Sequence, residues 1–195
     1  MFDKINVIKI VKDHISTFKD YRTNKYKIGD FILFFGIPLL IAGIFSYFNI
    51  SLTHNLISLL ITSLSIFAAL LFNLLLLIYD VVQKTKNESA LKIRFLKEVY
   101  SNISFCILIA ILAVIILILI SCYDELYVRN DNMYYYCHVL LSIFNGINDI
   151  NNTLFIYRIF NFIAYYLIIL FLLTLFMILK RIHILLYKEY KEVEK

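Results

Sequence analysis

Hydrophobic residues are gathered into four long runs along the chain, separated by polar segments. The runs cover residues 31–50, 55–82, 103–122 and 154–179. Each has about the 20 residues that an α-helix needs to cross roughly 30 Å of hydrocarbon, and none carries a Lys or Glu in its middle. The pattern therefore predicts an all-α membrane protein whose residues 31–179 form four transmembrane helices. Within the first run, Pro38 removes a backbone hydrogen bond and predicts a kink.

Residues 1–30 predict an amphipathic helix ahead of the first run. Apolar residues recur there at spacings of three and four, at Phe2, Ile5, Ile8, Val11, Ile15 and Phe18. Such spacing places them on one face of a helix, opposite a face rich in Lys and Asp. This helix is expected either to be an ordinary solvated helix or to lie in the inner headgroup layer, or against neighbouring subunits.

The connections between the runs differ in length and character. Only residues 51–54 join the first two runs, which predicts a tight antiparallel hairpin. In the linker 83–102, apolar residues at spacing four predict that the third helix extends about three turns into the cytoplasm. The outer loop 123–153 contains the run "MYYYCHVLLSIFNGI", which is too short to span and suits a half-buried interfacial helix. Residues 180–195 form a basic tail.

Composition and charge define the topology. The chain is 62% hydrophobic and 17% charged, whereas soluble domains are about 45–50% apolar and about 25% charged. Seventeen of its 19 Lys and Arg residues lie in residues 1–30, in the linker 83–102 or in the tail. Basic residues stay on the inner side, so both termini and the linker are expected in the cytoplasm. The net charge of +5 therefore requires no nucleic-acid partner.

The sequence carries no pattern typical of an enzyme or a metalloprotein. Its four histidines, His14, His54, His138 and His183, are scattered without metal-ligand spacing. Phosphate-loop and nucleophile motifs are missing, and so are charges at the centre of a run. We therefore expect no catalysis, no cofactor and no metal. Cys122 and Cys137 both fall on the outer side, where a disulfide could form, and the sequence leaves their pairing open.

The second run contains a line of small and polar residues, which we call the polar stripe. It consists of Ser58, Thr62, Ser65, Ala69, Asn73 and Asp80. Spacings near 3.5 residues keep these positions on one side of a supercoiled helix. Three interpretations remain open: the stripe lines a pore formed by several copies of the chain, it packs within one subunit, or it docks another protein.

Each interpretation assigns different partners to the stripe. In a homo-oligomer of three to five copies, with a tetramer favoured, Asn73 forms a ring of amides and Asp80 an acidic mouth that favours cations. Leu76 and Leu77 then form an apolar gate. Packing within one subunit would instead pair Asn73 with Asn161, Asn102 or Ser104. Asp80 could equally form an ordinary helix-end pair with Lys84.

The stretch "SLSIFAALLFNLLLLIYDVVQK", between a short outer turn and a basic helix, resembles the small multi-span effectors of bacterial anti-phage defence systems of the Hailong and Kiwa types. The resemblance implies an inner-membrane effector that depolarises the cell in abortive infection. It also implies a cytoplasmic partner that either makes nucleotides or binds DNA. An oligonucleotide made by such a nucleotidyltransferase would contact basic cytoplasmic residues, for which the candidates are Lys92, Arg94, Lys97, Lys180 and Arg181. The alternative is a non-conducting scaffold that anchors a cytoplasmic partner.

Overall fold

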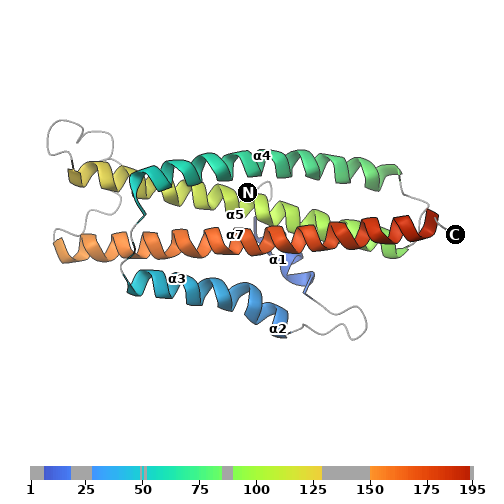
Figure 1. Ribbon diagram of the computed structural model, residues 1–195, viewed down its shortest axis with the longest axis horizontal. Coiled ribbons are helices and arrows are strands. Elements are labelled where there is room, and N and C mark those ends of the chain that lie inside the picture. Colours follow the sequence, from blue (N-terminus) through green and yellow to red (C-terminus); the bar gives the residue numbers. More distant parts are fainter. Residues whose placement is uncertain are drawn as a thin grey trace, which may run out of the picture.

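All regular secondary structure that the computed structural model describes is helical, as the sequence predicted (Figure 1). The described residues are 7–18, 28–48, 50, 52–84, 90–128 and 150–193. The helices, in chain order, are α1 (Val7–Ser16), α2 (Ile28–Phe31), the π-helical η1 (Ile32–Gly36), α3 (Ile37–Tyr47), α4 (His54–Lys84), α5 (Ala90–Val128) and α7 (Ile150–Val193).

Three of these helices are long and apolar enough to cross a membrane. The qualifying stretches are His54–Lys84, Lys92–Cys122 and Tyr157–Tyr187, which coincide with the second, third and fourth hydrophobic runs. They fit a multi-pass membrane protein. The predicted N-terminal extension of the third helix is confirmed as helix, because α5 is helical without a break from Ala90. The predicted interfacial helix of the outer loop falls largely outside the described residues.

The first hydrophobic run is a shorter helical unit. Helices α2, η1 and α3 follow one another without a gap, and the π-helical turn ends two residues before Pro38. Proline has no N–H to donate to the preceding turn, and a π-helical turn is a common form of local disruption in a helix. The predicted irregularity at Pro38 therefore takes the form of a π-helical segment.

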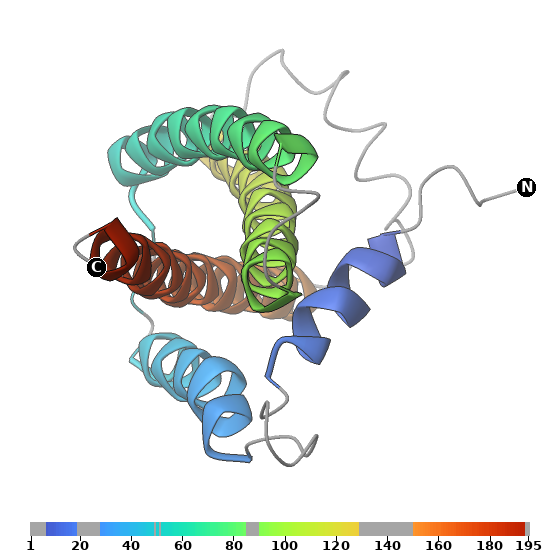
Figure 2. The same cartoon turned by 90° about the vertical axis from the view of Figure 1, so that its right-hand side faces the viewer.

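The helices pack in the spatial order α4, α5, α7, α3, and α1 lies against α5. Figure 2, which looks along the bundle, shows this row as an open arc. Helices α3 and α4 do not pack against each other over the described residues, so the predicted tight hairpin is wrong.

The connection between α3 and α4 explains this separation. Of this connection the structure describes Phe48, Ile50, Leu52 and Thr53, and Ile50 lies against α7. The Tyr165 hydroxyl of α7 donates a hydrogen bond to the Ile50 carbonyl oxygen at 3.3 Å, and Leu52 is buried. Tyr165 also packs edge-on against Phe45. The connection is therefore part of the packing of α7.

Helix α5 is the centre of the bundle. Its fully buried residues recur at spacings of three and four, at Ile103, Cys106, Ala110, Ala113, Leu117 and Ile120. Small residues such as Ala110 and Ala113 allow neighbouring helices to approach closely. Helix α4 meets α5 through a buried line in which every seventh residue is apolar, at Ile57, Leu64, Leu71 and Ile78. This spacing is typical of left-handed helix pairs.

Candidate functional site

The polar stripe lies on the outer surface of the bundle. Every one of its members is exposed, and so are the two proposed gate residues: Ser58, Thr62, Ser65, Ala69, Asn73, Asp80, Leu76 and Leu77. The backbone of α4 lies next to that of α5 alone among the described helices, and the Phe67 ring of α4 also approaches the Phe171 ring of α7 at 6.0 Å. Within the most hydrophobic window of each long helix, 17% of α4 is buried, against 44% of α5 and 33% of α7. The stripe is therefore carried by the least enclosed of the three long helices.

The stripe and the buried line of α4 occupy different sides of the helix. An α-helix turns about 100° per residue. Ser65 comes one residue after the buried Leu64, and Asn73 comes two residues after the buried Leu71. These offsets place the stripe about 100° to 200° around α4 from the buried line. One side of α4 thus packs the subunit, and the other presents polar groups outward.

The stripe hydroxyls are satisfied by the helix itself. Thr62 donates to the Ser58 carbonyl oxygen at 2.9 Å, and Ser65 donates to the Ile61 carbonyl oxygen at 2.8 Å. Such bonds to the preceding turn are common for Ser and Thr in apolar helices. In contrast, the side chains of Asn73 and Asp80 have no hydrogen-bond or ion-pair partner within the described part of the chain. Their polar groups are available to something outside the subunit.

The partners proposed for Asn73 within one subunit are engaged elsewhere. The Asn161 amide donates to the Tyr157 carbonyl oxygen, Ser104 donates to the Tyr100 carbonyl oxygen, and Asn102 accepts from His14. Asp80 and Lys84, which are both described, form no ion pair. Among the described residues, Asn73 and Asp80 are therefore left without a partner in the subunit.

A second group of polar residues, which the sequence analysis missed, joins α1 to the bundle. We call His14, Thr17, Glu98, Asn102 and Arg181 the buried polar cluster. His14 Nδ1 lies 2.9 Å from Asn102 Oδ1, and because an amide oxygen only accepts, the imidazole donates there. Thr17 Oγ1 lies 2.7 Å from the His14 carbonyl oxygen and 3.2 Å from Asn102 Oδ1. Its single proton therefore serves mainly the nearer oxygen.

Aromatic rings complete the environment of His14. Its imidazole stacks on Phe105 of α5 at a centroid distance of 3.8 Å and an interplanar angle of 7°. Phe18 meets the same imidazole edge-on at 5.1 Å. His14 is fully buried, and burial lowers its pKa from 6.5 to about 4, although the bond to Asn102 opposes the shift and the Arg181 charge adds to it. His14 is therefore neutral at pH 7.

The residues that dock the N-terminal helix on the bundle are not those of its apolar line alone. Ile8 of that line is 78% exposed, whereas the polar His14 and Thr17 are buried. The spacing of apolar residues in the N-terminal helix cannot reveal that Asn102 and Phe105 of α5 contact the His14 side chain. The sequence did contain one sign of a buried polar contact, since the polar Asn102 ends the basic linker directly before a long apolar run.

Arg181 of α7 extends the cluster to a third helix. Its guanidinium donates to the Thr17 carbonyl oxygen at 3.1 Å and lies 3.2 Å from Glu98 Oε2. Arg94 approaches the same carboxylate at 3.3 Å. Of the five basic residues proposed for ligand binding, Arg94 and Arg181 therefore share Glu98. Lys97 and Lys180 are exposed, and Lys92 is half-buried.

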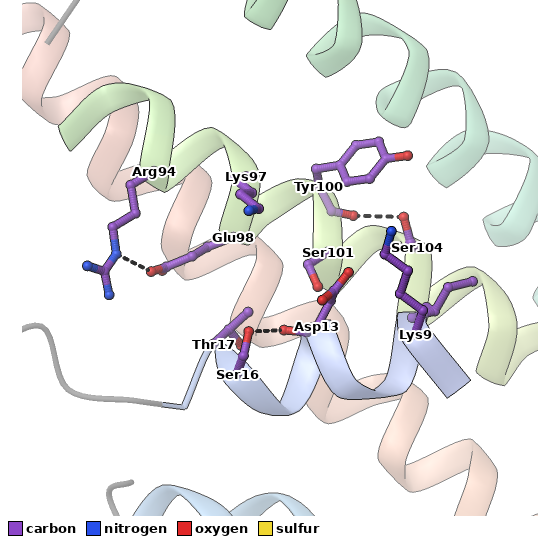
Figure 3. Close-up of a pocket in the computed structure, with 11 residues that line it drawn as sticks. Lys9, Asp13, Ser16, Thr17, Arg94, Lys97, Glu98, Tyr100, Ser101 and Ser104 are labelled. Atoms are coloured by element: carbon purple, nitrogen blue, oxygen red, sulfur yellow. Dashed lines mark hydrogen bonds and ion pairs between the residues drawn. The ribbon is translucent and has the colours of Figure 1, made fainter. Parts of the chain in front are cut away.

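A cleft of about 630 Å³ lies between α1 and the first turns of α5 (Figure 3). Its charged and hydroxyl lining includes Lys9, Asp13, Arg94, Lys97, Ser101 and Ser104. The structure thus brings Arg94 and Lys97 together at one cleft and adds Lys9, while Lys92, Lys180 and Arg181 do not line it.

Two further predictions concern cysteine and metal chemistry. Cys137 lies outside the described residues, so its pairing with Cys122 stays a prediction. Within the described segments, no three His, Cys, Asp or Glu side chains are grouped to hold a metal ion.

Comparison with family models, with curated proteins and with solved structures finds no match for this chain.

Proposed function

We propose that this protein is the subunit of a homo-oligomeric membrane channel in which several copies of α4 turn the polar stripe toward a shared axis. One observation supports the proposal above all. The entire stripe is exposed on the subunit, and the side chains of Asn73 and Asp80 have no partner among the described residues. A carboxamide that faces hydrocarbon alone is costly. Copies of the same amide around an axis, or water between them, remove that cost.

The oligomer is required because one subunit provides no enclosed path. Helices α4, α5, α7 and α3 form an open row, and α4 is at one end of it. Closed rings are the usual form of homo-oligomers, and we favour four subunits. Residues of the stripe would then form a wettable wall from Ser58 to Asn73.

The inner end of α4 supplies a gate and an entrance in this assembly. Leu76 and Leu77 are 50% and 58% exposed, so nothing in the subunit prevents them from facing an axis. A ring of either leucine would stop ions by dewetting. Asp80, one turn further along, would form an acidic ring that attracts cations.

The proposed topology has four crossings and places both termini in the cytoplasm. The unbroken helical unit of residues 28–47 is about 30 Å long at 1.5 Å per residue, which supports its assignment as the first crossing. In the resemblance described above, such a protein is an effector of anti-phage defence that depolarises the bacterial inner membrane. We propose this role for the assembled channel.

Ion flux through liposomes that contain the purified protein tests the channel. We expect flux from the parent, and reduced flux from Asn73→Leu because the amide ring is lost. Asp80→Asn is expected to lower the preference for cations over anions. Phe67→Leu is the matched control, since Phe67 is exposed on the same helix away from the stripe. A parent protein that is monomeric and shows no flux would refute the proposal.

The alternative, a non-conducting scaffold, is favoured by a different observation. Helix α1 and the inner part of α5 form a cleft with charged walls, which suits the capture of a cytoplasmic partner or ligand. A tetramer without flux whose α1 binds a partner would support this alternative.

A further inference from the structure

The cleft between α1 and α5 contains a polar group that the protein leaves unused. Ser101 is 9% exposed and lines the cleft, and its hydroxyl is buried without a hydrogen-bond partner. Figure 3 shows this hydroxyl pointing from α5 toward α1. A buried hydroxyl without a partner is destabilising, and a bound ligand that accepts its proton would remove that cost.

The charges around the cleft select the kind of ligand. Its lining carries three cations, Lys9, Arg94 and Lys97, and two carboxylates, Asp13 and Glu98. Glu98 is already paired with Arg94 and with Arg181 behind it. The cleft therefore keeps a positive balance, and Lys97 is exposed at its wall.

The Ser101 hydroxyl adds a donor next to these cations, because the neighbouring Ser104 gives its single proton to a backbone carbonyl oxygen. Ser104 lines the cleft one turn along α5 from Ser101 and is held by its bond to the Tyr100 carbonyl oxygen at 2.9 Å. Ammonium groups together with hydroxyls are the donors that bind phosphate oxygens. The volume of about 630 Å³ falls in the range of 300–1,000 Å³ that is typical of small-molecule sites.

We propose that this cleft binds a phosphate-bearing ligand, with Lys97 and Ser101 contacting its phosphate group. The ligand lies between α1 and α5 and holds α1 in its docked position. Under the proposed topology, the cleft is at the inner membrane surface. The phosphate can therefore come from an anionic lipid headgroup or from a soluble phosphorylated molecule.

Two binding measurements on the purified full chain in detergent distinguish these sources. The lipid measurement compares phosphatidylglycerol with diacylglycerol, which lacks the phosphate, by native mass spectrometry. The soluble measurement titrates pyrophosphate by calorimetry. Retention of phosphatidylglycerol alone assigns the site to lipid, and binding of pyrophosphate alone assigns it to a soluble ligand. Binding in neither measurement would overturn the proposal.

Variants locate the binding. Lys97→Gln is expected to weaken it about tenfold or more, and Ser101→Ala about fivefold, as expected for hydrogen bonds to a charged group. Lys180→Gln is the matched control, because Lys180 is also exposed and basic but does not line the cleft. Equal weakening by Lys180→Gln, or unchanged binding by both cleft variants, would contradict the assignment. These measurements do not depend on ion flux, so their failure leaves the proposed channel untouched.

Discussion

His14 Nδ1 lies 2.9 Å from Asn102 Oδ1, and this contact joins two segments that are 88 residues apart in the sequence. Asn102 follows the basic linker, directly before the apolar part of α5. The contact therefore fastens the N-terminal helix to the N-terminal third of the central helix α5. Because Arg181 of α7 reaches the end of the same N-terminal segment, three parts of the chain meet at one point.

Removal of the His14 side chain is expected to release α1. His14→Ala loses the stack on Phe105 and the hydrogen bond to Asn102. Cavity formation and the unpaired amide together are expected to cost about 2–4 kcal/mol of docking free energy. Hydrogen exchange of the α1 amides measures the loss. Ile8→Ala is the control, since Ile8 is 78% exposed, and equal deprotection by both variants would contradict the assignment.

Acid is expected to weaken the docking of α1. The pKa of His14 is about 4 when buried and 6.5 in its ordinary state, so the docked form binds fewer protons than the released form. Docking is therefore fully stable above pH 6.5. It loses about 1.4 kcal/mol per pH unit as the pH falls from 6.5 to about 4.

Pulsed electron paramagnetic resonance between spin labels at positions 8 and 93, which are both exposed, measures this effect of pH. The distance distribution should broaden between pH 7.5 and pH 5. In His14→Phe, which keeps an aromatic ring but cannot titrate, that broadening should be absent. If His14→Phe shows the same broadening as the parent protein, the pH dependence comes from a group other than His14.

Loss of the Arg181 guanidinium is expected to loosen the contact of α7 with both α1 and α5. Arg181 is only 15% exposed and contacts Thr17 and Glu98. Arg181→Gln leaves Glu98 paired with Arg94 and is expected to cost about 1–3 kcal/mol of stability. The melting temperature in detergent measures this cost. Lys180→Gln, the neighbouring exposed position, should leave the melting temperature nearly unchanged.

Cysteine cross-linking tests the proposed shared axis directly. In a background without native cysteines, Thr62→Cys and Asn73→Cys should each form disulfide-linked dimers in membranes, because copies of one position approach each other at an axis. Phe67→Cys should not, since Phe67 faces away from the stripe and packs edge-on near Phe171 at 6.0 Å. Equal cross-linking at all three positions would indicate random collision.

The sequence was sufficient to predict the long helices, because their signal is local. Apolar runs of the required length predicted α4, α5 and α7, and the spacing in the linker predicted the inner extension of α5. The exposure of Asn73 could not be predicted, since the same spacing suits packing inside a subunit. Whether Asn73 is buried or exposed depends on the position of α4, which lies at the end of the row of packed helices α4, α5, α7 and α3.

The errors arose where distant segments determine the structure. The short 51–54 connection suggested a hairpin. Instead, Ile50 is bound to α7, because Tyr165, more than a hundred residues later, donates a hydrogen bond to its carbonyl oxygen. The N-terminal helix showed a regular apolar pattern, yet its buried face includes His14 because Asn102 and Phe105 receive that ring. Both outcomes depend on contacts that no local pattern contains.

The division of α4 into two sides has a consequence for how this protein can evolve. One side of α4 packs within its own subunit through Ile57, Leu64, Leu71 and Ile78. The opposite side makes no packing contact that the fold of the subunit requires. Replacements at Thr62 or Asn73 can thus accumulate without unfolding the chain. Relatives are expected to preserve the inward heptad for packing, whereas changes on the outward side would alter the proposed channel without altering the fold of the subunit.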